Sequence, residues 1–177
     1  MKTNVMFHRG NAPKMEQDIY LTIALAKKEK NPSQLTKAYH DALHYTPSEN
    51  LKLQYADSAI TAAHLSCRDD LLATAYMGKG IVYYFNFKQY RPALQEYIKA
   101  MSYAEKAEDF YLIHKIGYHL GVVKSYLGDH GNAIRHFEYG AAYFLAEMQQ
   151  QLPGRKGFPK SSGVHARGGV RLDKYQI

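Results

Sequence analysis

The chain has 177 residues, enough for one domain, and its 46% hydrophobic content excludes a wholly disordered protein. No run of apolar residues approaches the roughly 20 that span a bilayer, and the N-terminal residues do not form a secretory signal. The single cysteine, Cys67, excludes an intramolecular disulfide. The net charge of +7 includes +5 from residues 152–177, so the nearly balanced remainder lacks a basic face for nucleic acid. A cytoplasmic protein is expected.

The pattern of apolar residues and turn residues predicts an all-α chain. Asn31-Pro32 ends the first helix, because proline lacks a donor and restricts the residue before it. Ser33 is expected to cap the second helix, and Gly128-Asp129-His130-Gly131 is expected to form a tight turn in which both glycines are free to take positive φ. We predict an N-terminal arm over residues 1–13, followed by seven helices at residues 14–30, 33–45, 46–66, 71–86, 90–107, 110–127 and 132–151.

The sequence repeats itself with a period of 41 residues. Residues 58–80 align with residues 99–121, and small residues fall on small ones and apolar residues on apolar ones at helical spacing. Gly80 and Gly121 occupy matching positions, where we expect a close approach of two helices, and aromatic residues such as Tyr97 and Phe137 are expected to fill the complementary space. The period therefore predicts stacked helix pairs.

Residues 119–137 carry a recognisable motif. Leu120-Gly121, the turn at Gly128-Asp129, Ala133 and Phe137 have the spacing of the tetratricopeptide repeat, which this chain resembles over residues 33–151. The resemblance implies a right-handed superhelix of about three helix pairs preceded by one helix, within a repeat domain of residues 14–151. More narrowly, the tyrosine-rich, long repeats resemble the sensor regions of Bacteroidetes regulators with an AraC-type helix-turn-helix domain, which this sequence lacks.

The resemblance also implies a binding groove on the inner face of the superhelix. Some family members hold the C-terminal carboxylate of a ligand with lysine and asparagine side chains at these positions. The lining in this chain is apolar and tyrosine-rich instead, and such a lining suits an amphipathic helix of a protein partner. Alternatively, several of these side chains only pack between repeats. The implied lining residues are Thr74, Met77, Ile81, Tyr84, Phe85, Lys115, Tyr118, Val122, Ser125 and Tyr126.

Residues 152–177 are rich in glycine and basic residues and have no apolar period, so we expect a disordered tail. Three interpretations remain open: a solvated tail without a function, a basic arm that contacts nucleic acid or an acidic partner, and a truncated or out-of-frame terminus. In the last case the outer face of the final helix lacks a capping helix and favours self-association. The basic arm would use Arg155, Lys156, Lys160, Arg167, Arg171 and Lys174.

The sequence offers few candidates for catalysis or metal binding. His40 and His44 stand one helical turn apart but have no evident third ligand, and Cys67 has only His64 nearby as a base. Gly78-Lys79-Gly80 lacks the spacing of a phosphate-binding loop and falls inside a predicted helix. We therefore expect a protein-interaction module without catalytic residues, metal or cofactor, and with nucleic acid only as the alternative partner.

Overall fold

A computed structural model describes residues 12–151, and within this range the chain is entirely helical. The all-α prediction is confirmed, and the helix ends lie within three residues of the predicted ones. The predicted tail lies outside the described residues, as does the predicted arm except for its last two residues, which belong to the first helix. The helices are α1 (Ala12–Lys28), α2 (Pro32–Tyr45), α3 (Glu49–Ser66), α4 (Asp69–Phe85), α5 (Tyr90–Lys106), α6 (Phe110–Tyr126) and α7 (His130–Gln151).

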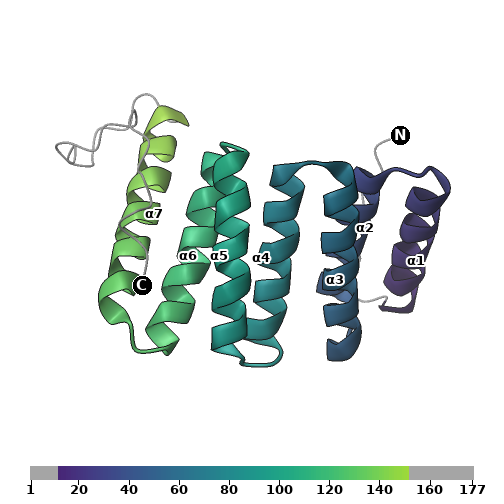
Figure 1. Cartoon of the computed structure of the whole chain (residues 1–177), viewed down its shortest axis with the longest axis horizontal. Helices are drawn as coiled ribbons and strands as arrows, with labels where there is room; N and C mark the ends of the chain where they lie inside the picture. Colours follow the sequence, from purple (N-terminus) through teal and green to yellow (C-terminus); the bar gives the residue numbers. More distant parts are fainter. Residues whose placement is uncertain (1–11, 152–177) are drawn as a thin grey trace.

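The helices follow one another in a row in chain order, with α2 partly behind α3, and consecutive helices run in opposite directions (Figure 1). Each helix packs against the next one along the chain, and α4 additionally contacts α2 and α6. These extra contacts place α2, α4 and α6 next to one another. The row therefore has one layer of alternate helices, α2, α4 and α6, that form a common face.

Side-chain caps set the starts of several helices. The Asn31 side chain accepts a hydrogen bond from the backbone N–H of Gln34 at 3.1 Å, so Asn31 caps α2 and the expected cap, Ser33, lies inside the helix. Pro32 is tolerated there because the first helical residues need no backbone donor. The Asp109 side chain accepts from the N–H of Leu112 at 2.9 Å and caps α6 in the same way.

Three helices end in the same hydrogen-bonded turn, the Schellman motif, in which one residue takes a left-handed conformation. This residue is Lys30 after α1, Glu108 after α5 and Gly128 after α6, with φ values of 50°, 53° and 84°. The prediction of positive φ is confirmed for Gly128, whereas Gly131 lies within the first turn of α7 and does not have it. Only one of these three turns therefore has the glycine that the motif favours.

The repeat in the sequence corresponds to a repeat in the packing. Helices α3 and α5 begin 41 residues apart, and so do α4 and α6. A Cβ atom placed on Gly80 would lie 2.5 Å from the ring of Tyr97, and one on Gly121 would lie 2.8 Å from the ring of Phe137. Each glycine thus lets an aromatic ring of the following helix lie against the backbone, as the alignment predicted.

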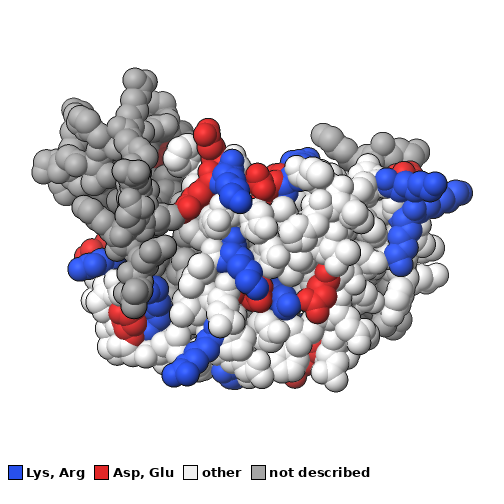
Figure 2. Space-filling view, in the orientation of Figure 1, with Lys and Arg blue, Asp and Glu red and all other residues white. Residues whose placement is uncertain are grey.

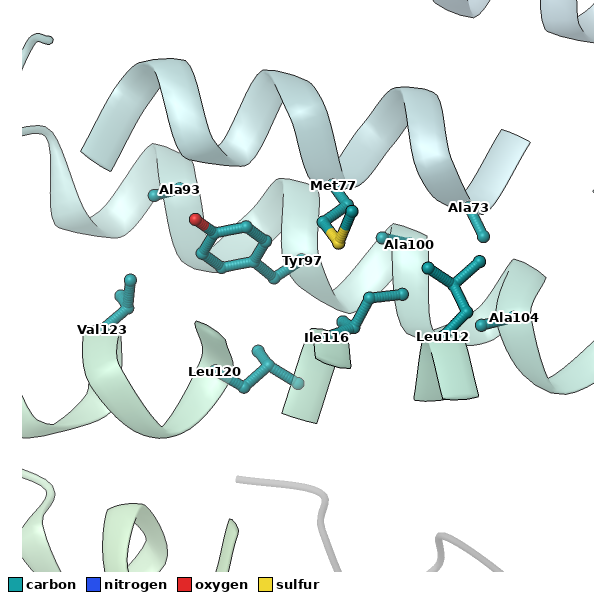
Figure 3. Close-up of a cluster of buried hydrophobic side chains, with 10 residues drawn as sticks. All are labelled: Ala73, Met77, Ala93, Tyr97, Ala100, Ala104, Leu112, Ile116, Leu120 and Val123. Atoms are coloured by element: carbon teal, nitrogen blue, oxygen red, sulfur yellow. The ribbon is translucent and has the colours of Figure 1, made fainter. Parts of the chain in front are cut away.

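The largest group of buried side chains joins α4, α5 and α6 (Figure 3). Tyr97 lies in its middle and is fully buried, and short alanines of α5 leave space for the larger side chains of α4 and α6. This core holds α4 and α6 against α5. The group contains Ala73, Met77, Ala93, Tyr97, Ala100, Ala104, Leu112, Ile116, Leu120 and Val123.

Candidate functional site

The ten residues of the predicted groove lie on α4 and α6, and they differ widely in exposure. Phe85, Tyr118 and Tyr126 are exposed by 57%, 55% and 59%, and Lys115 is also exposed. The half-buried members are Thr74, Ile81, Tyr84, Val122 and Ser125. The surface that these residues offer to a ligand is therefore mainly aromatic.

Met77 is placed differently from the prediction. Its side chain is only 2% exposed and lies among Tyr97, Ala100 and Ile116 in the core (Figure 3). Thr74 has a local role as well, because its hydroxyl donates to the backbone carbonyl of Asp70 at 2.9 Å. Met77 therefore belongs to the packing between helices, which was the alternative interpretation for part of the groove.

Four aromatic residues form a cluster that we call the tyrosine patch: Tyr84, Phe85, Tyr90 and Tyr126. The ring of Tyr118, earlier on α6, contacts His119 and Phe137 instead. The rings of Tyr90 and Tyr126 are stacked, with centroids 4.8 Å apart and an interplanar angle of 14°. Tyr84 lies beside both, with its centroid 5.6 Å from that of Tyr126, and the ring of Phe85 meets Tyr84 edge-on at 4.6 Å. The patch thus joins the C-terminal ends of α4 and α6 to the first residue of α5.

The hydroxyl groups of the patch interact with one another. A hydrogen bond with Tyr126, together with burial and the nearby Tyr90 and Tyr118, raises the pKa of Tyr84 to about 12. The ammonium group of Lys88 lies 5.9 Å from the ring centroids of both Tyr84 and Phe85. The patch therefore combines aromatic rings and hydroxyl groups with a nearby cation.

A second cluster consists of histidines on the same layer of helices. His40 lies against Gly78 of α4, where an added Cβ would approach the imidazole to 3.3 Å, and the His40 and His44 rings meet at 4.6 Å. Burial, with the nearby His44 and Lys115, lowers the pKa of His40 to about 4. The ring of His119 stacks on Tyr97 at 5.3 Å, and burial, with Lys115 nearby, lowers the pKa of His119 to about 4. The imidazoles of His40 and His119 are therefore neutral at pH 7.

The other candidates from the sequence show ordinary packing contacts. Gly78 and Gly80 are buried inside α4. Cys67 is exposed, and the imidazole of His64 lies 3.3 Å from the hydroxyl of Tyr76, whereas the cysteine sulfur contacts only the backbone carbonyl of His64 at 3.9 Å. Within the described part of the chain, no group of three His, Cys, Asp or Glu residues is arranged to hold a metal ion.

Charge is mixed on the surface of the helical row. Basic and acidic side chains are interspersed on the described part of the face in Figure 2. The basic residues of the alternative nucleic-acid site, Arg155 to Lys174, lie outside the described residues. Among the helices of residues 12–151, none has the length and apolar character needed to cross a bilayer.

One member of the tyrosine patch, Tyr90, and the neighbouring cation, Lys88, are not among the residues predicted to line the groove. Neither was expected at the groove, because all of the implied lining residues lie in the two helices predicted at residues 71–86 and 110–127. The short connection between α4 and α5, residues 86–89, is the feature of the sequence that could have indicated Tyr90 and Lys88 as neighbours of the groove. Such a short turn necessarily brings the start of α5 next to the end of α4.

No family model matches this sequence, and no curated protein or solved structure matches it either. The resemblance to the tetratricopeptide repeat therefore remains a prediction from the motif at residues 119–137.

Proposed function

We propose that this chain is a tetratricopeptide-like superhelix that binds a peptide segment of a protein partner on the face formed by α2, α4 and α6. The observation that carries the proposal is the tyrosine patch, in which Phe85 and Tyr126 are each more than half exposed on either side of Tyr84. Aromatic residues, tyrosine in particular, are enriched in protein interfaces, where they supply apolar area and a hydroxyl together. A regulatory part of a larger transcriptional or signalling system, acting in the cytoplasm, is the setting we propose.

The contacts of the patch support binding better than a purely structural role. Tyr118 and Tyr126 are more than half exposed, although α6 also carries fully buried side chains such as Ile116 and Val123. The ring of Tyr97, which serves packing, is fully buried, whereas the rings of Tyr118 and Tyr126 remain open to a ligand. Because the patch is built on helix ends held by the core of α4, α5 and α6, a partner would meet a preformed surface.

The proposal is tested by selecting ligands from a random-peptide display library with the full chain. Enriched peptides are then titrated against the wild type and the variant Phe85→Ala/Tyr126→Ala, and we expect the variant to bind at least about tenfold more weakly, as for hot-spot residues. The matched control is Tyr20→Ala/Phe110→Ala, which removes two similarly exposed rings from α1 and from the start of α6. If no peptide is enriched, or if both variants bind like the wild type, the proposal is wrong.

Self-association is a second candidate, and it is favoured by the exposed side of α7. Within residues 12–151, α7 contacts only α6, and its exposed residues include Ile134, Leu145 and Met148. A second copy of the chain would cover these side chains, since exposed apolar patches of this kind mark interaction sites. Sedimentation equilibrium should show a dimer that Leu145→Lys/Met148→Lys converts to a monomer; a monomeric wild type at high concentration would exclude this candidate.

Binding of nucleic acid through Arg155, Lys156, Lys160, Arg167, Arg171 and Lys174 is the remaining alternative. Titration of duplex DNA against the full chain and against a chain that ends at Gln151 tests it directly. Tail-dependent binding that weakens steeply with salt would support this alternative, whereas equally weak binding by both chains would exclude it.

A further inference from the structure

We propose that the ligand of the tyrosine patch is an extended, proline-rich segment of a partner protein, flanked by acidic residues. This inference rests on the proposed peptide-binding function and specifies the class of peptide. It follows from three properties of the patch: the geometry of its rings, the hydrogen-bonding groups it offers and the charge around it.

The rings of the patch are turned toward different directions. Tyr90 and Tyr126 are parallel, Tyr84 is inclined to them by 49° and 60°, and Phe85 stands at 84° to Tyr84. The implied groove offers little aliphatic surface to the apolar face of a helical ligand, since Met77 is in the core and Ile81 and Val122 are half-buried. Separate, rigid proline rings pack well on such inclined aromatic rings, and aromatic-lined sites are the usual hosts of proline-rich segments.

The patch offers hydrogen-bond donors beside its rings. The Lys88 ammonium, close to Tyr84 and Phe85, can only donate. The tyrosine hydroxyls can donate as well as accept, and those of Tyr84 and Tyr126 share one hydrogen bond with each other. A proline-rich segment in the polyproline II conformation presents unpaired carbonyl groups and almost no N–H groups. A helical ligand, in contrast, has its carbonyls paired internally. The donors of the patch therefore match the acceptors of a proline-rich segment.

A positive charge lies at the patch. The ammonium group of Lys88 stands over the rings of Tyr84 and Phe85. Lys124 is paired with Asp129 at 3.2 Å, and Lys115 lies over Tyr111, which is not part of the patch. Acidic residues beside the prolines would be attracted to Lys88, and basic residues would be repelled.

The test is a titration of the full chain with fluorescently labelled peptides, followed by anisotropy. The peptides are an oligoproline with flanking glutamates, the same peptide with flanking lysines, an amphipathic helical peptide and a glycine-serine peptide of equal length. We expect the acidic oligoproline to bind most tightly, and its affinity to fall as salt is raised. The glycine-serine peptide should not bind.

Variants separate the ring contacts from the hydroxyl contacts. Tyr126→Ala should weaken binding of the acidic oligoproline by about tenfold or more, and Tyr126→Phe, which keeps the ring, by about three- to tenfold for one lost hydrogen bond. Lys88→Met should reduce the preference for glutamate flanks, and Tyr20→Ala should change nothing. Circular dichroism of each variant verifies that the helices are intact.

Two results would overturn the inference in distinguishable ways. If the helical peptide, or a library peptide without proline, binds through the patch while neither oligoproline binds, the ligand class is wrong and the proposed peptide-binding function stands. If no peptide of any class binds, both are wrong. Oligoproline binding that survives Tyr126→Ala and Phe85→Ala unchanged would place the ligand elsewhere and would also overturn the inference.

Discussion

Replacement of Gly80 by alanine tests the packing on which the whole row of helices depends. A Cβ atom at this position would lie 2.5 Å from Cε1 and 2.6 Å from Cδ1 of Tyr97, far inside normal contact distance. The Tyr97 ring has little room to move, because it is fully buried and stacks on His119. The new methyl group must therefore separate α4 from α5.

The magnitude follows from two opposing effects. Forcing a methyl group into a well-packed core costs about 1–3 kcal/mol, and the rigid ring of Tyr97 places Gly80→Ala near the upper end. Alanine in a helix interior is favoured over glycine by about 1 kcal/mol, which offsets part of this cost. We expect the free energy of unfolding to fall by about 2 kcal/mol. Gly121→Ala should cost less, about 1 kcal/mol, because the facing Phe137 is only half-buried and can shift.

Urea unfolding followed by circular dichroism measures these differences. Gly131→Ala is the control, because this glycine also lies in a helix and a Cβ there would meet no atom within 4 Å. The control should be as stable as the wild type or slightly more stable. In the background Tyr97→Leu, the cost of Gly80→Ala should largely disappear, since the opposing ring is gone. A Gly80→Ala protein as stable as the Gly131→Ala protein would refute the reasoning.

Three further predictions follow. Burial lowers the pKa of His40 from 6.5 to about 4, so between these pH values only the unfolded chain binds a proton at this imidazole. The free energy of unfolding should therefore be highest above pH 6.5 and should decrease as the pH falls toward 4. Urea unfolding at a series of pH values should show a smaller decrease for His40→Leu. Glu108→Gly should raise the free energy of unfolding by about 0.5–1 kcal/mol, as glycine removes the strain of a left-handed residue, whereas Glu108→Ala should not. Asp109→Ala should lower the melting temperature through a loss of about 1 kcal/mol at the start of α6, with Asp109→Asn retaining most of the stability.

The helices could be predicted because their signals are local. Pro32 and the polar turns mark the boundaries, and the 41-residue period alone is enough to pair Gly80 with Gly121. The details that were missed involve competition between neighbouring signals. Asn31 caps α2 in place of Ser33, and Lys30 and Glu108 take left-handed conformations without glycine, because the hydrogen bonds of the turn outweigh the local preference.

The candidate site was only partly predictable, since helical phase does not determine how deeply a side chain is buried. Met77 and Tyr118 both occupy positions of the implied groove, but the alanines of α5 leave space that Met77 fills, while Tyr118 remains exposed. Tyr90 belongs to a different helix, α5, and reaches the site because the turn between α4 and α5 is short. Helical phase within α4 or α6 cannot indicate this contact. The burial of His40 Nε2 without a hydrogen-bond partner, beside Gly78, likewise could not be predicted, because it results from contacts between residues far apart in the sequence.

The row-like arrangement also bears on how the chain folds. The contacts between helices join each helix to the next or, for α4, to α2 and α6, so that within residues 12–151 no contact between helices skips more than one intervening helix. A low contact order of this kind favours rapid folding that starts in one segment and spreads to its neighbours. The segment with the most continuous core, α4 to α6, is the natural nucleus, and amide hydrogens there should exchange most slowly while those of α1 and α7 exchange first.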